Sequence, residues 1–404
     1  MTKPRRPVVR RLGIVAIVMA LIVAGYVSYV AVRHVRPVAL PVASGPYLVG
    51  RSRVEWTDPA RVDPLAPVAG TPRRLAVWLW YPAVAGGDMR PAPYAPGPWA
   101  RLHLAAPVGW AESDFTAIRN GAYEDAPVAP GRFPIVVLEP GMGFSAPQYS
   151  VLAESLAGHG FMVAAVTPTY SANLTVLGGR IVGAEKAGNP PELGSHSGEL
   201  GAQADRLVGI WAADAHFVAA EVAALDRGGA LAGHIDATRV AYIGHSFGGA
   251  AALEACRSDP ACAGAVDMDG TQFGPVARKG LRPPTLVLGH ENSCVTGGCA
   301  PSGRDDRDDL AVAQSLIAAS SGPVWAFTVD GTAHFDFTDY AAYYLATPLR
   351  RFLALGSLDG RRALTITSFL VTAFLDQAML GRRSVVLDTG GSPYPEVRVR
   401  HLPR

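Results

Sequence analysis

The stretch 240–254 constrains the fold of this chain more strongly than any other. It reads VAYIGHSFGGAAALE, so an apolar, β-favouring run enters a G-x-S-x-G pentapeptide and leaves through an alanine-rich helix former. A strand, a sharp turn and a helix in this order present the central serine strained and exposed, which makes Ser246 the candidate nucleophile. Side chains at Gly244 and Gly248 would collide where strand and helix cross. The helix that follows aims its first N–H groups at the oxygen side of the reaction.

The pentapeptide alone is weak evidence, because a chain with 44 glycines can contain one in an ordinary glycine-rich turn. Its surroundings strengthen it. Three more strand-like runs follow, at 263–268, 285–288 and 324–329. Asp269 ends the first run, and His334 follows the last on a short loop that contains glycine. Serine, acid and histidine in this order supply a nucleophile, a base and the carboxylate that orients the base.

Two other acids compete with Asp269 for the place beside His334. Glu291 follows the next strand along the chain, where the commonest version of such a site carries its acid. Asp267 points to the same face as Asp269 but lies one step back from the carboxyl end of the strand, where such sites assemble.

Two other histidines are weaker candidates for the base. His245 is adjacent to Ser246 in the sequence, so its side chain should project elsewhere. His290 follows a strand too early in the usual order of acid and histidine.

The oxyanion hole has two candidate donors. The apolar run 133–138 reads as a central parallel strand and ends in EPGMGF at 139–144. The loop after that strand commonly lends one backbone N–H to the developing oxyanion, and the residue after the nucleophile lends the other. Met142 and Phe247 are therefore the expected donors.

The rest of the chain alternates between strand-like and helix-like runs. Strands are expected at 75–81 and 161–166 and helices at 148–158 and 199–225, with 171–198 as loop. This order predicts an α/β fold whose mostly parallel central sheet is flanked by helices. The segment 83–131, dense in proline and glycine and containing Trp99, Trp110 and Phe115, is either a packed surface excursion or part of the rim of the site.

The N-terminus departs from this pattern. Leu12–Val32 is a run of 21 residues without a charge, preceded by five Lys/Arg and followed closely by two. About 20 apolar residues span a bilayer, so the run predicts a transmembrane helix with residues 1–11 as a cytoplasmic basic tail and the bulk of the chain outside. Residues 33–44 are expected to form a stalk, and 45–404 the catalytic domain. The alternative is a cleaved signal peptide and a secreted protein, although signal peptides usually carry a shorter apolar region.

Composition and charge exclude several other classes. Hydrophobic residues make up 49% and charged residues 17%, which does not fit a disordered or coiled-coil chain. Residues 1–36 contain seven of the 36 Lys/Arg and no acid, so the remainder carries 29 basic against 34 acidic residues. This distribution has no basic footprint for nucleic acid.

The four cysteines form two pairs at short spacing. Local disulfides, Cys256 with Cys262 and Cys294 with Cys299, are the expected pairing in an exported domain. Zinc is less favoured, because neither spacing resembles C-x2-C.

Several short motifs in this order resemble the α/β-hydrolase fold and, more narrowly, the plasma-type platelet-activating factor acetylhydrolase family and its bacterial relatives. The matching pieces are Gly45–Gly50, Trp80–Pro82, Gly141–Gly143, Tyr149–Ser150, Gly160–Val166, Gly244–Gly249, Asp269–Gly270 and Gly331–His334. Two features depart from the family: Pro140 stands where it usually has a histidine, and an expected anchor stands where the plasma enzyme has a cleaved signal.

The resemblance implies a site and an activity. It implies Ser246 as nucleophile, Asp269 as the acid, His334 as base, Met142 and Phe247 as oxyanion donors, and no metal or other cofactor. Glu291 stays the alternative acid.

The implied function is a serine carboxylic ester hydrolase that acts through an acyl-enzyme on short-chain or oxidised phospholipid esters. A general or polyester-type esterase is the first alternative, with peptidase and acyltransferase chemistry below it. A catalytically silent, hydrolase-like binding domain is the alternative from another class.

Overall fold

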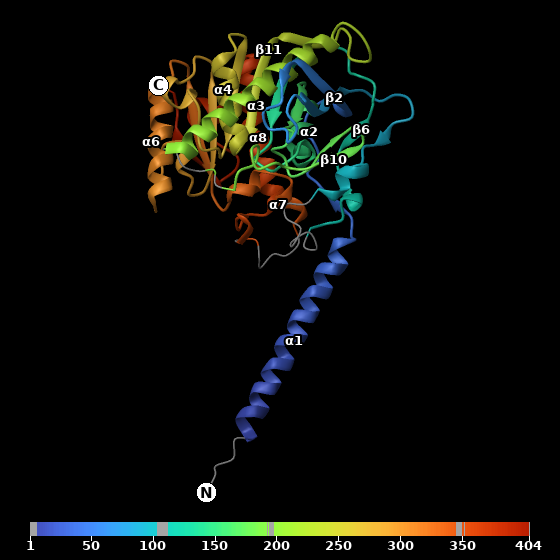
Figure 1. Ribbon diagram of the computed structural model, residues 1–404, viewed down its shortest axis with the longest axis vertical. Coiled ribbons are helices and arrows are strands. Elements are labelled where there is room, and N and C mark those ends of the chain that lie inside the picture. The colour runs from blue at the N-terminus through green and yellow to red at the C-terminus, as the bar shows by residue number, and fades with distance from the viewer. Residues whose placement is uncertain are drawn as a thin grey trace.

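The computed structural model describes residues 6–102, 112–191, 193, 198–344, 350 and 352–403 (Figure 1). Its helices are α1 (Arg6–His34), α2 (Ser150–Gly158), α3 (Gly198–Leu225), α4 (Phe247–Ser258), α5 (Val276–Lys279), α6 (Arg304–Ala319), α7 (Tyr340–Tyr343), α8 (Gly360–Leu380) and α9 (Val385–Thr389). Short 3-10 helices are η1 (Gly97–Arg101), η3 (Phe115–Ala117), η4 (Ala146–Tyr149), η5 (Cys294–Thr296) and η6 (His334–Phe337).

The strands of the amino-terminal half are β1 (Val38–Ala39), β2 (Leu48–Val62), β3 (Pro72–Ala83), β4 (Arg90–Pro91), β5 (Ile118–Arg119), β6 (Ala122–Glu124), β7 (Phe133–Glu139), β8 (Met162–Thr167), β9 (Thr175–Leu177) and β10 (Arg180–Val182). Those of the carboxyl-terminal half are β11 (Ile235–His245), β12 (Cys262–Met268), β13 (Thr285–His290), β14 (Val324–Val329) and β15 (Val397–His401).

Most of these strands form a single mixed sheet. Among the described residues, 11 strands pair in the order β15-β14-β13-β12-β11-β7-β8-β3-β2-β6-β4. The six strands from β14 to β8 pair in parallel, and β15 and β3 flank this block in antiparallel orientation. The expectation of an α/β fold around a large, mostly parallel sheet is therefore confirmed.

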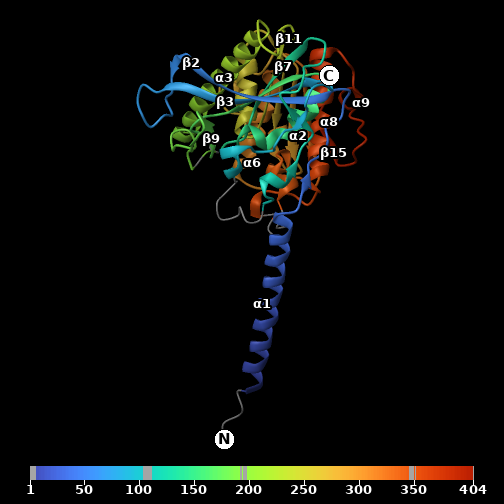
Figure 2. The same ribbon diagram turned by 90° about the vertical axis from the view of Figure 1, so that its right-hand side faces the viewer.

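Helices cover both faces of the sheet. Alternate residues of β7 point to opposite faces, as a strand dictates: Val136 and Leu138 join one hydrophobic cluster with α2 and α8, and Ile135 and Val137 join another with α3 and α4. Figure 2 shows α3 and α8 on opposite sides of the sheet. The core is thus two apolar layers separated by strands that are buried on both faces, as the continuous apolar runs predicted.

The parallel block places the candidate residues at one edge. Ser246 follows β11 directly, and Asp269 follows β12. His334 lies a few residues beyond β14, at the start of η6. Because β11, β12 and β14 run in the same direction, their carboxyl ends bring these residues to the same end of the sheet.

Helix α1 projects from the domain in both ribbon views (Figures 1 and 2). Its part Arg10–His34 is long and apolar enough to cross a bilayer, and only 6% of its most apolar window is buried. Two other helices, α3 and α8, are also long and apolar enough to cross a bilayer, but 44% and 67% of their most apolar stretches are buried inside the protein. Packing therefore accounts for the apolar surface of α3 and α8, but not for that of α1.

The carboxyl end of α1 docks on the domain. Val30 is fully buried, and the carbonyl of His34 accepts a hydrogen bond of 2.8 Å from the N–H of Asp114. β1, within residues 33–44, pairs in parallel with β5, and Leu40 is buried. The segment 33–44, expected to form a stalk, is therefore partly packed against the domain, because its apolar residues find a partner in 112–119.

Two other segments carry more structure than their sequences indicated. The described parts of 83–131 contain η1, η3 and β4 to β6, and Trp99 and Phe115 are buried there. The ring of Trp99 packs edge-on against Trp78 of β3, as the packed-surface interpretation predicted. Trp110 lies outside the described residues. The expectation that 171–198 is loop is wrong in part, since β9 and β10 form an antiparallel hairpin there.

Candidate active site

Three side chains meet at the carboxyl edge of the sheet. Nε2 of His334 lies 2.9 Å from Oγ of Ser246, which can donate its hydroxyl hydrogen to that nitrogen. Nδ1 of the same ring lies 2.7 Å from Oδ2 of Asp269 and donates to it. Asp269 is almost completely buried, while the imidazole of His334 keeps about a third of its surface exposed. The structure thus brings together the serine, histidine and acid that the sequence predicted.

The backbone around Ser246 has the strain expected of a nucleophile elbow. Ser246 adopts φ 55° and ψ −126°, a left-handed conformation that costs a non-glycine residue on the order of 1–3 kcal/mol. A Cβ at Gly244 would lie 2.1 Å from the carbonyl oxygen of Gly248, and one at Gly248 would lie 2.2 Å from the carbonyl oxygen of Pro140. Side chains are therefore excluded at both glycines as predicted, at Gly244 by the crossing of β11 and α4 and at Gly248 by the end of β7 and the loop that follows it.

Asp269 is held as an anion by its neighbours. The residue follows β12 directly and, like Ser246, has a positive φ, in its case 59°. Burial alone would raise the pKa of this carboxyl, but the imidazoles of His290 and His334 outweigh burial and hold the pKa well below its usual range. An ionised acid beside Nδ1 of His334 favours the ring tautomer whose Nε2 can take a proton from Ser246.

His290 is the residue at this site that sequence reasoning missed. Its Nδ1 lies 2.9 Å from Oδ1 and 2.8 Å from Oδ2 of Asp269, and its backbone N–H donates to Oδ1 over 3.1 Å. The signal was present in the sequence, since His290 ends β13, which pairs in parallel with β12. Residues just past the ends of neighbouring parallel strands are expected to meet.

The two competing acids lie elsewhere. Oε2 of Glu291 accepts a hydrogen bond of 3.0 Å from the N–H of Gly331. Asp267 is fully buried, and its carboxylate accepts from the N–H of Gly270 and from the side-chain amide of Gln272, both over 2.9 Å. Glu291 therefore supports the loop that leads to His334, and Asp267 supports the turn after Asp269.

The expected oxyanion donors belong to one packed unit. Phe247 is the first residue of α4, and its buried ring packs against Trp211 of α3. Met142 follows β7 and packs against the same hydrophobic cluster. Within the described part of the chain, the backbone N–H groups of Met142 and Phe247 donate to no other protein atom. In that part of the chain, both groups are available to bind an oxygen atom.

The ring nitrogens of His245 bond to Tyr149 and to the backbone carbonyl of His334, so His245 is not the base that contacts Ser246 Oγ. Its ring is buried and lies behind the ring of His334, with the two centroids 4.8 Å apart. Burial, together with the charge that His334 can carry, lowers the pKa of His245 to about 3. The imidazole of His245 is therefore neutral at any pH near neutrality.

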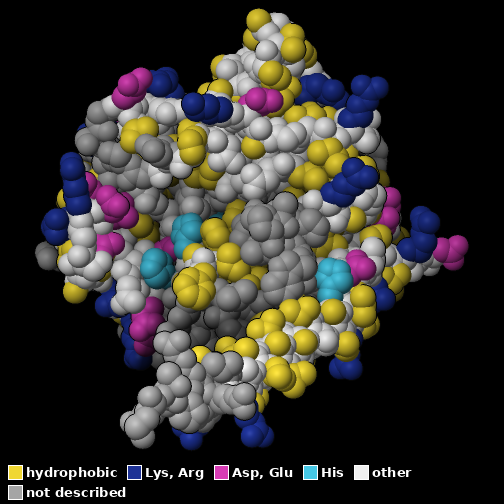
Figure 3. All heavy atoms as spheres, turned by 60° about the horizontal axis from the view of Figure 1, so that its bottom comes forward, with side chains coloured by type: hydrophobic (Ala, Val, Ile, Leu, Met, Phe, Trp, Pro, Cys, Tyr) yellow, Lys and Arg dark blue, Asp and Glu magenta, His cyan; other side chains and the backbone are white. Residues whose placement is uncertain are grey.

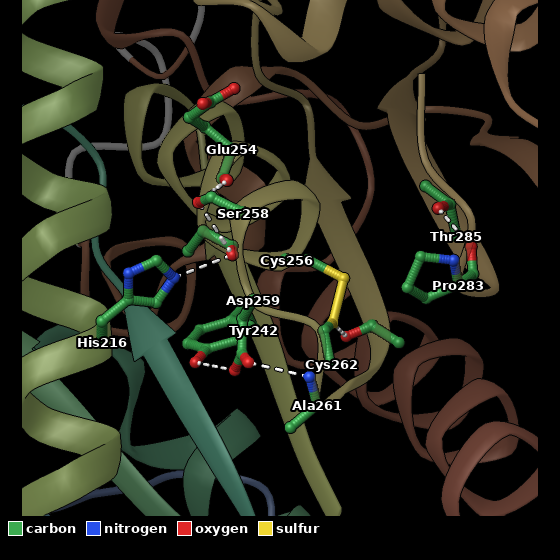
Figure 4. The surroundings of a disulfide bond; sticks show 12 residues. His216, Tyr242, Glu254, Cys256, Ser258, Asp259, Ala261, Cys262, Pro283 and Thr285 are labelled. Carbon is green, nitrogen blue, oxygen red and sulfur yellow. Dashed lines mark hydrogen bonds between the residues drawn. A yellow bond between two sulfur atoms is a disulfide. The ribbon is translucent and has the colours of Figure 1, made fainter. Parts of the chain in front are cut away.

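Both predicted disulfides are present. Cys256–Cys262 links the last turn of α4 to the start of β12, and Cys294–Cys299 closes the loop that follows β13. Figure 4 shows the first bond beside Tyr242 and Asp259, whose side chains are hydrogen-bonded to one another. Among the residues that the structure describes, no group of three or more His, Cys, Asp or Glu side chains could hold a metal ion.

The surface at this end of the molecule is hollowed. Figure 3, viewed from the side of α1, shows two histidine side chains close together beside hydrophobic side chains at a depression. Helix α7, which follows η6 by two residues, lies at the end of the domain from which α1 emerges (Figure 1).

A sheet of this topology, with a serine on a strained elbow and a histidine and an acid on the next loops, defines the α/β-hydrolase class. The chain matches the family model described as platelet-activating factor acetylhydrolase, isoform II, over residues 101–178 and 226–385, which is more than half of its length. It belongs to this family. It is accordingly a carboxylic ester hydrolase of the serine, acetylhydrolase-like type.

Two individual proteins agree with this assignment. A probable 1-alkyl-2-acetylglycerophosphocholine esterase from Arthroderma benhamiae is 23% identical over 387 residues, covering 89% of this chain and 92% of the relative. A solved structure of a ferulic acid esterase from Streptomyces cinnamoneus is 28% identical, with a TM-score of 0.71, and covers 90% of this chain and 99% of that one.

Proposed function

We propose that Ser246, His334 and Asp269 form the catalytic triad of this ester hydrolase. The observation that carries the proposal is the continuous run of hydrogen bonds from Ser246 Oγ through both ring nitrogens of His334 to Asp269, at 2.9 and 2.7 Å. These distances fall within the reach that direct proton transfer needs.

The reaction then proceeds in two halves. His334 takes the hydroxyl proton as Ser246 attacks the ester carbonyl, and Asp269 stabilises the resulting imidazolium. The tetrahedral intermediate collapses, His334 gives the proton to the departing alcohol, and an acyl group stays on Ser246. Water, deprotonated by His334, attacks the acyl group in the same way and releases the acid.

The N–H groups of Met142 and Phe247 are proposed to bind the oxyanion of both tetrahedral intermediates. One lies on the loop after β7 and the other at the first turn of α4, where the helix dipole also favours negative charge. A preorganised donor of this kind contributes about 10²–10³-fold to turnover.

We further propose that the substrate is a phospholipid ester whose acyl group is short-chain or oxidised. The ring centroid of Phe335 lies 5.3 Å from that of His334 and 5.1 Å from that of Phe144, so apolar side chains lie directly beside the base. The fungal relative is named for cleaving an acetyl ester of a glycerophosphocholine, whereas the solved neighbour is a ferulic acid esterase. A general esterase that accepts such aromatic acids is the second candidate.

Rates on p-nitrophenyl esters of increasing chain length, on a 1-alkyl-2-acetyl glycerophosphocholine and on methyl ferulate would separate the two candidates. A steep fall beyond four acyl carbons, with turnover of the acetyl phospholipid, is the expected result. Turnover of methyl ferulate above that of the acetyl phospholipid would favour the general esterase.

Helix α1 is proposed to anchor the protein in the cytoplasmic membrane, with residues 45–404 outside the cytoplasm. Its apolar surface is exposed, and five Lys/Arg precede the apolar run. Two disulfides agree with an oxidising compartment. The docking of Val30 and His34 supports retention of the helix, because cleavage of a signal peptide after Val32 would remove Val30 from its buried place. N-terminal sequencing of the mature protein tests this directly.

The triad is tested by Ser246→Ala, with labelling by an alkyl fluorophosphonate as the second readout. Loss of a triad nucleophile costs on the order of a millionfold in turnover. The variant should neither hydrolyse esters nor react with the probe, while its thermal unfolding stays that of a folded protein. A wild-type protein that fails to label would instead support the silent binding domain.

A further inference from the structure

A line of three hydrogen bonds, two of them buried and one partly buried, runs behind the Ser246–His334 pair. The backbone N–H of Gly141 donates to Oη of Tyr149 over 2.8 Å, and this oxygen lies 2.9 Å from Nδ1 of His245. Nε2 of His245 lies 2.9 Å from the backbone carbonyl oxygen of His334. Tyr149 and His245 are each 1% exposed, so water has little access to the two bonds that the Tyr149 hydroxyl makes.

The direction of each bond follows from the chemistry of the partners. A carbonyl oxygen can only accept, so Nε2 of His245 carries the hydrogen and donates to His334. Nδ1 of the neutral ring is then an acceptor, which takes the hydroxyl hydrogen of Tyr149. The oxygen of Tyr149 in turn accepts from Gly141. Every polar group in the line is satisfied when His245 is neutral, which agrees with its pKa of about 3.

The line connects three separate parts of the site. Gly141 belongs to the loop after β7 and directly precedes Met142, a proposed oxyanion donor. His245 ends β11 immediately before the nucleophile, and His334 begins η6. Tyr149 lies at the junction of η4 and α2 and joins the first part to the second.

The loop is also in close contact with this line. A Cβ at Gly141 would lie 2.9 Å from Nδ1 of His245 and 3.3 Å from Oη of Tyr149. It would also lie 3.3 Å from Cβ of Ser246. The backbone of the oxyanion loop therefore packs directly against the nucleophile and the Tyr149–His245 pair.

We infer that Tyr149 and His245 are positioning residues that hold the oxyanion loop and the backbone of His334 at a fixed separation around Ser246. The inference rests on the proposed triad and oxyanion donors. The pair does not contact the reacting atoms. It fixes the positions of the Met142 N–H and the His334 ring relative to Ser246 before the substrate binds. Misplacement by about 1 Å can reduce turnover by about 10²-fold, so the pair should affect kcat more than KM.

Tyr149→Phe removes only the hydroxyl that links Gly141 to His245. Tyr242→Phe is the matched control, because Tyr242 is also buried, belongs to the same strand as His245 and donates to Asp259 over 2.7 Å (Figure 4). Tyr149→Phe loses two hydrogen bonds of the hydroxyl and Tyr242→Phe loses one, but Tyr242 lies beside the Cys256–Cys262 bond rather than at the catalytic edge.

We expect Tyr149→Phe to lower kcat for p-nitrophenyl acetate about 10–100-fold, with KM within about threefold of the wild-type value. Affinity for a trifluoromethyl ketone, which forms an oxyanion on Ser246, should fall by a similar factor. Tyr242→Phe should keep wild-type kcat and ketone affinity while its melting temperature falls. Equal kcat in both variants would overturn the inference and leave Tyr149 a purely structural residue.

His245 supplies a second pair of variants that remains decisive if Tyr149→Phe does not fold. Glutamine can set its amide nitrogen near the place of Nε2 and keep the bond to the His334 carbonyl, whereas leucine cannot. The expected order of kcat is wild type, then His245→Gln, then His245→Leu. A kcat for His245→Leu equal to that of the wild type would overturn the inference. Activity retained by Ser246→Ala would instead refute the triad itself, so the two failures are distinguishable.

Discussion

The carboxylate of Asp269 has a second imidazole beside it: Nδ1 of His290 lies 2.8 Å from Oδ2, the same oxygen that His334 approaches at 2.7 Å. Burial alone would lower the pKa of His290, but Asp269 outweighs burial and raises it, with Asp306 and Asp336 contributing in the same direction. The acid that serves His334 is therefore also the partner of a histidine that can become charged.

His290→Asn and His290→Leu separate the hydrogen bond from the charge. Asparagine can place an amide N–H near the position of Nδ1, whereas leucine offers none. The backbone N–H of residue 290 still donates to Asp269 in both variants, so the acid keeps one partner. We expect His290→Leu to lose about tenfold in kcat at pH 8, with a clearly smaller loss for His290→Asn. Equal kcat in the two variants would show that the side-chain N–H does not orient Asp269.

The same residue predicts how stability depends on pH. A histidine whose pKa is raised in the folded state contributes stability that is fully present below its unfolded pKa of about 6.5 and is lost as the pH rises through the folded value. The difference in melting temperature between wild type and His290→Asn should therefore be largest near pH 5 and should shrink towards pH 9. Scanning calorimetry over this range measures it, and a difference that grows with pH would contradict the prediction.

The part of the fold that the sequence could predict is the buried parallel block. Strand β14 coincides with the predicted run 324–329, because a strand covered on both faces is continuously apolar and stands out from its surroundings. The end strand β15 was not predicted, since it is short and its V-R-V-R-H alternation marks a strand exposed on one face. The hairpin of β9 and β10 was also not predicted, because each of its strands has only three residues.

The candidate site likewise contains residues that the sequence could predict and residues that it could not. Ser246, Asp269 and His334 could be found because each follows a recognisable strand. His290 also follows a recognisable strand, but its contact with Asp269 depends on the register of β12 with β13, and the contact of Tyr149 with His245 depends on the packing of α2.

The disulfide Cys256–Cys262 should stabilise the fold without affecting catalysis. It closes a loop of seven residues and lies at the far end of α4 from Ser246, roughly 15 Å along the helix. Replacing both cysteines by serine should reduce the free energy of unfolding by about 2 kcal/mol, because the unfolded chain gains entropy. Urea unfolding measures this, and a kcat below half of the wild-type value would contradict the proposed independence from the site.

Deleting Met1–Arg36 should release a soluble and active enzyme, because no proposed catalytic residue lies in that segment. The deletion removes the contact between His34 and Asp114 but keeps β1, which still pairs with β5. We expect kcat on a water-soluble ester within about twofold of the full-length value, and faster proteolysis near 112–119 because that segment loses a partner. A deletion variant that stays with the membrane fraction would refute α1 as the anchor.

The identity of the triad acid is tested by comparing Asp269→Asn with Glu291→Gln on the same ester. Asparagine at 269 would turn an N–H towards Nδ1 of His334 and favour the wrong ring tautomer, which costs triads about 10⁴-fold in kcat. Glu291→Gln keeps an oxygen that can accept from the N–H of Gly331, the bond that Glu291 makes in the structure. Its loss should therefore stay below about tenfold. Asp267→Asn is the control for burial, because Asp267 is as buried as Asp269 but its carboxylate accepts its hydrogen bonds from Gly270 and Gln272 in the turn that follows. A loss for Glu291→Gln that exceeds the loss for Asp269→Asn would move the acid to Glu291. That result would also mean that the short hydrogen bonds of Asp269 with His334 and His290 do not contribute to catalysis.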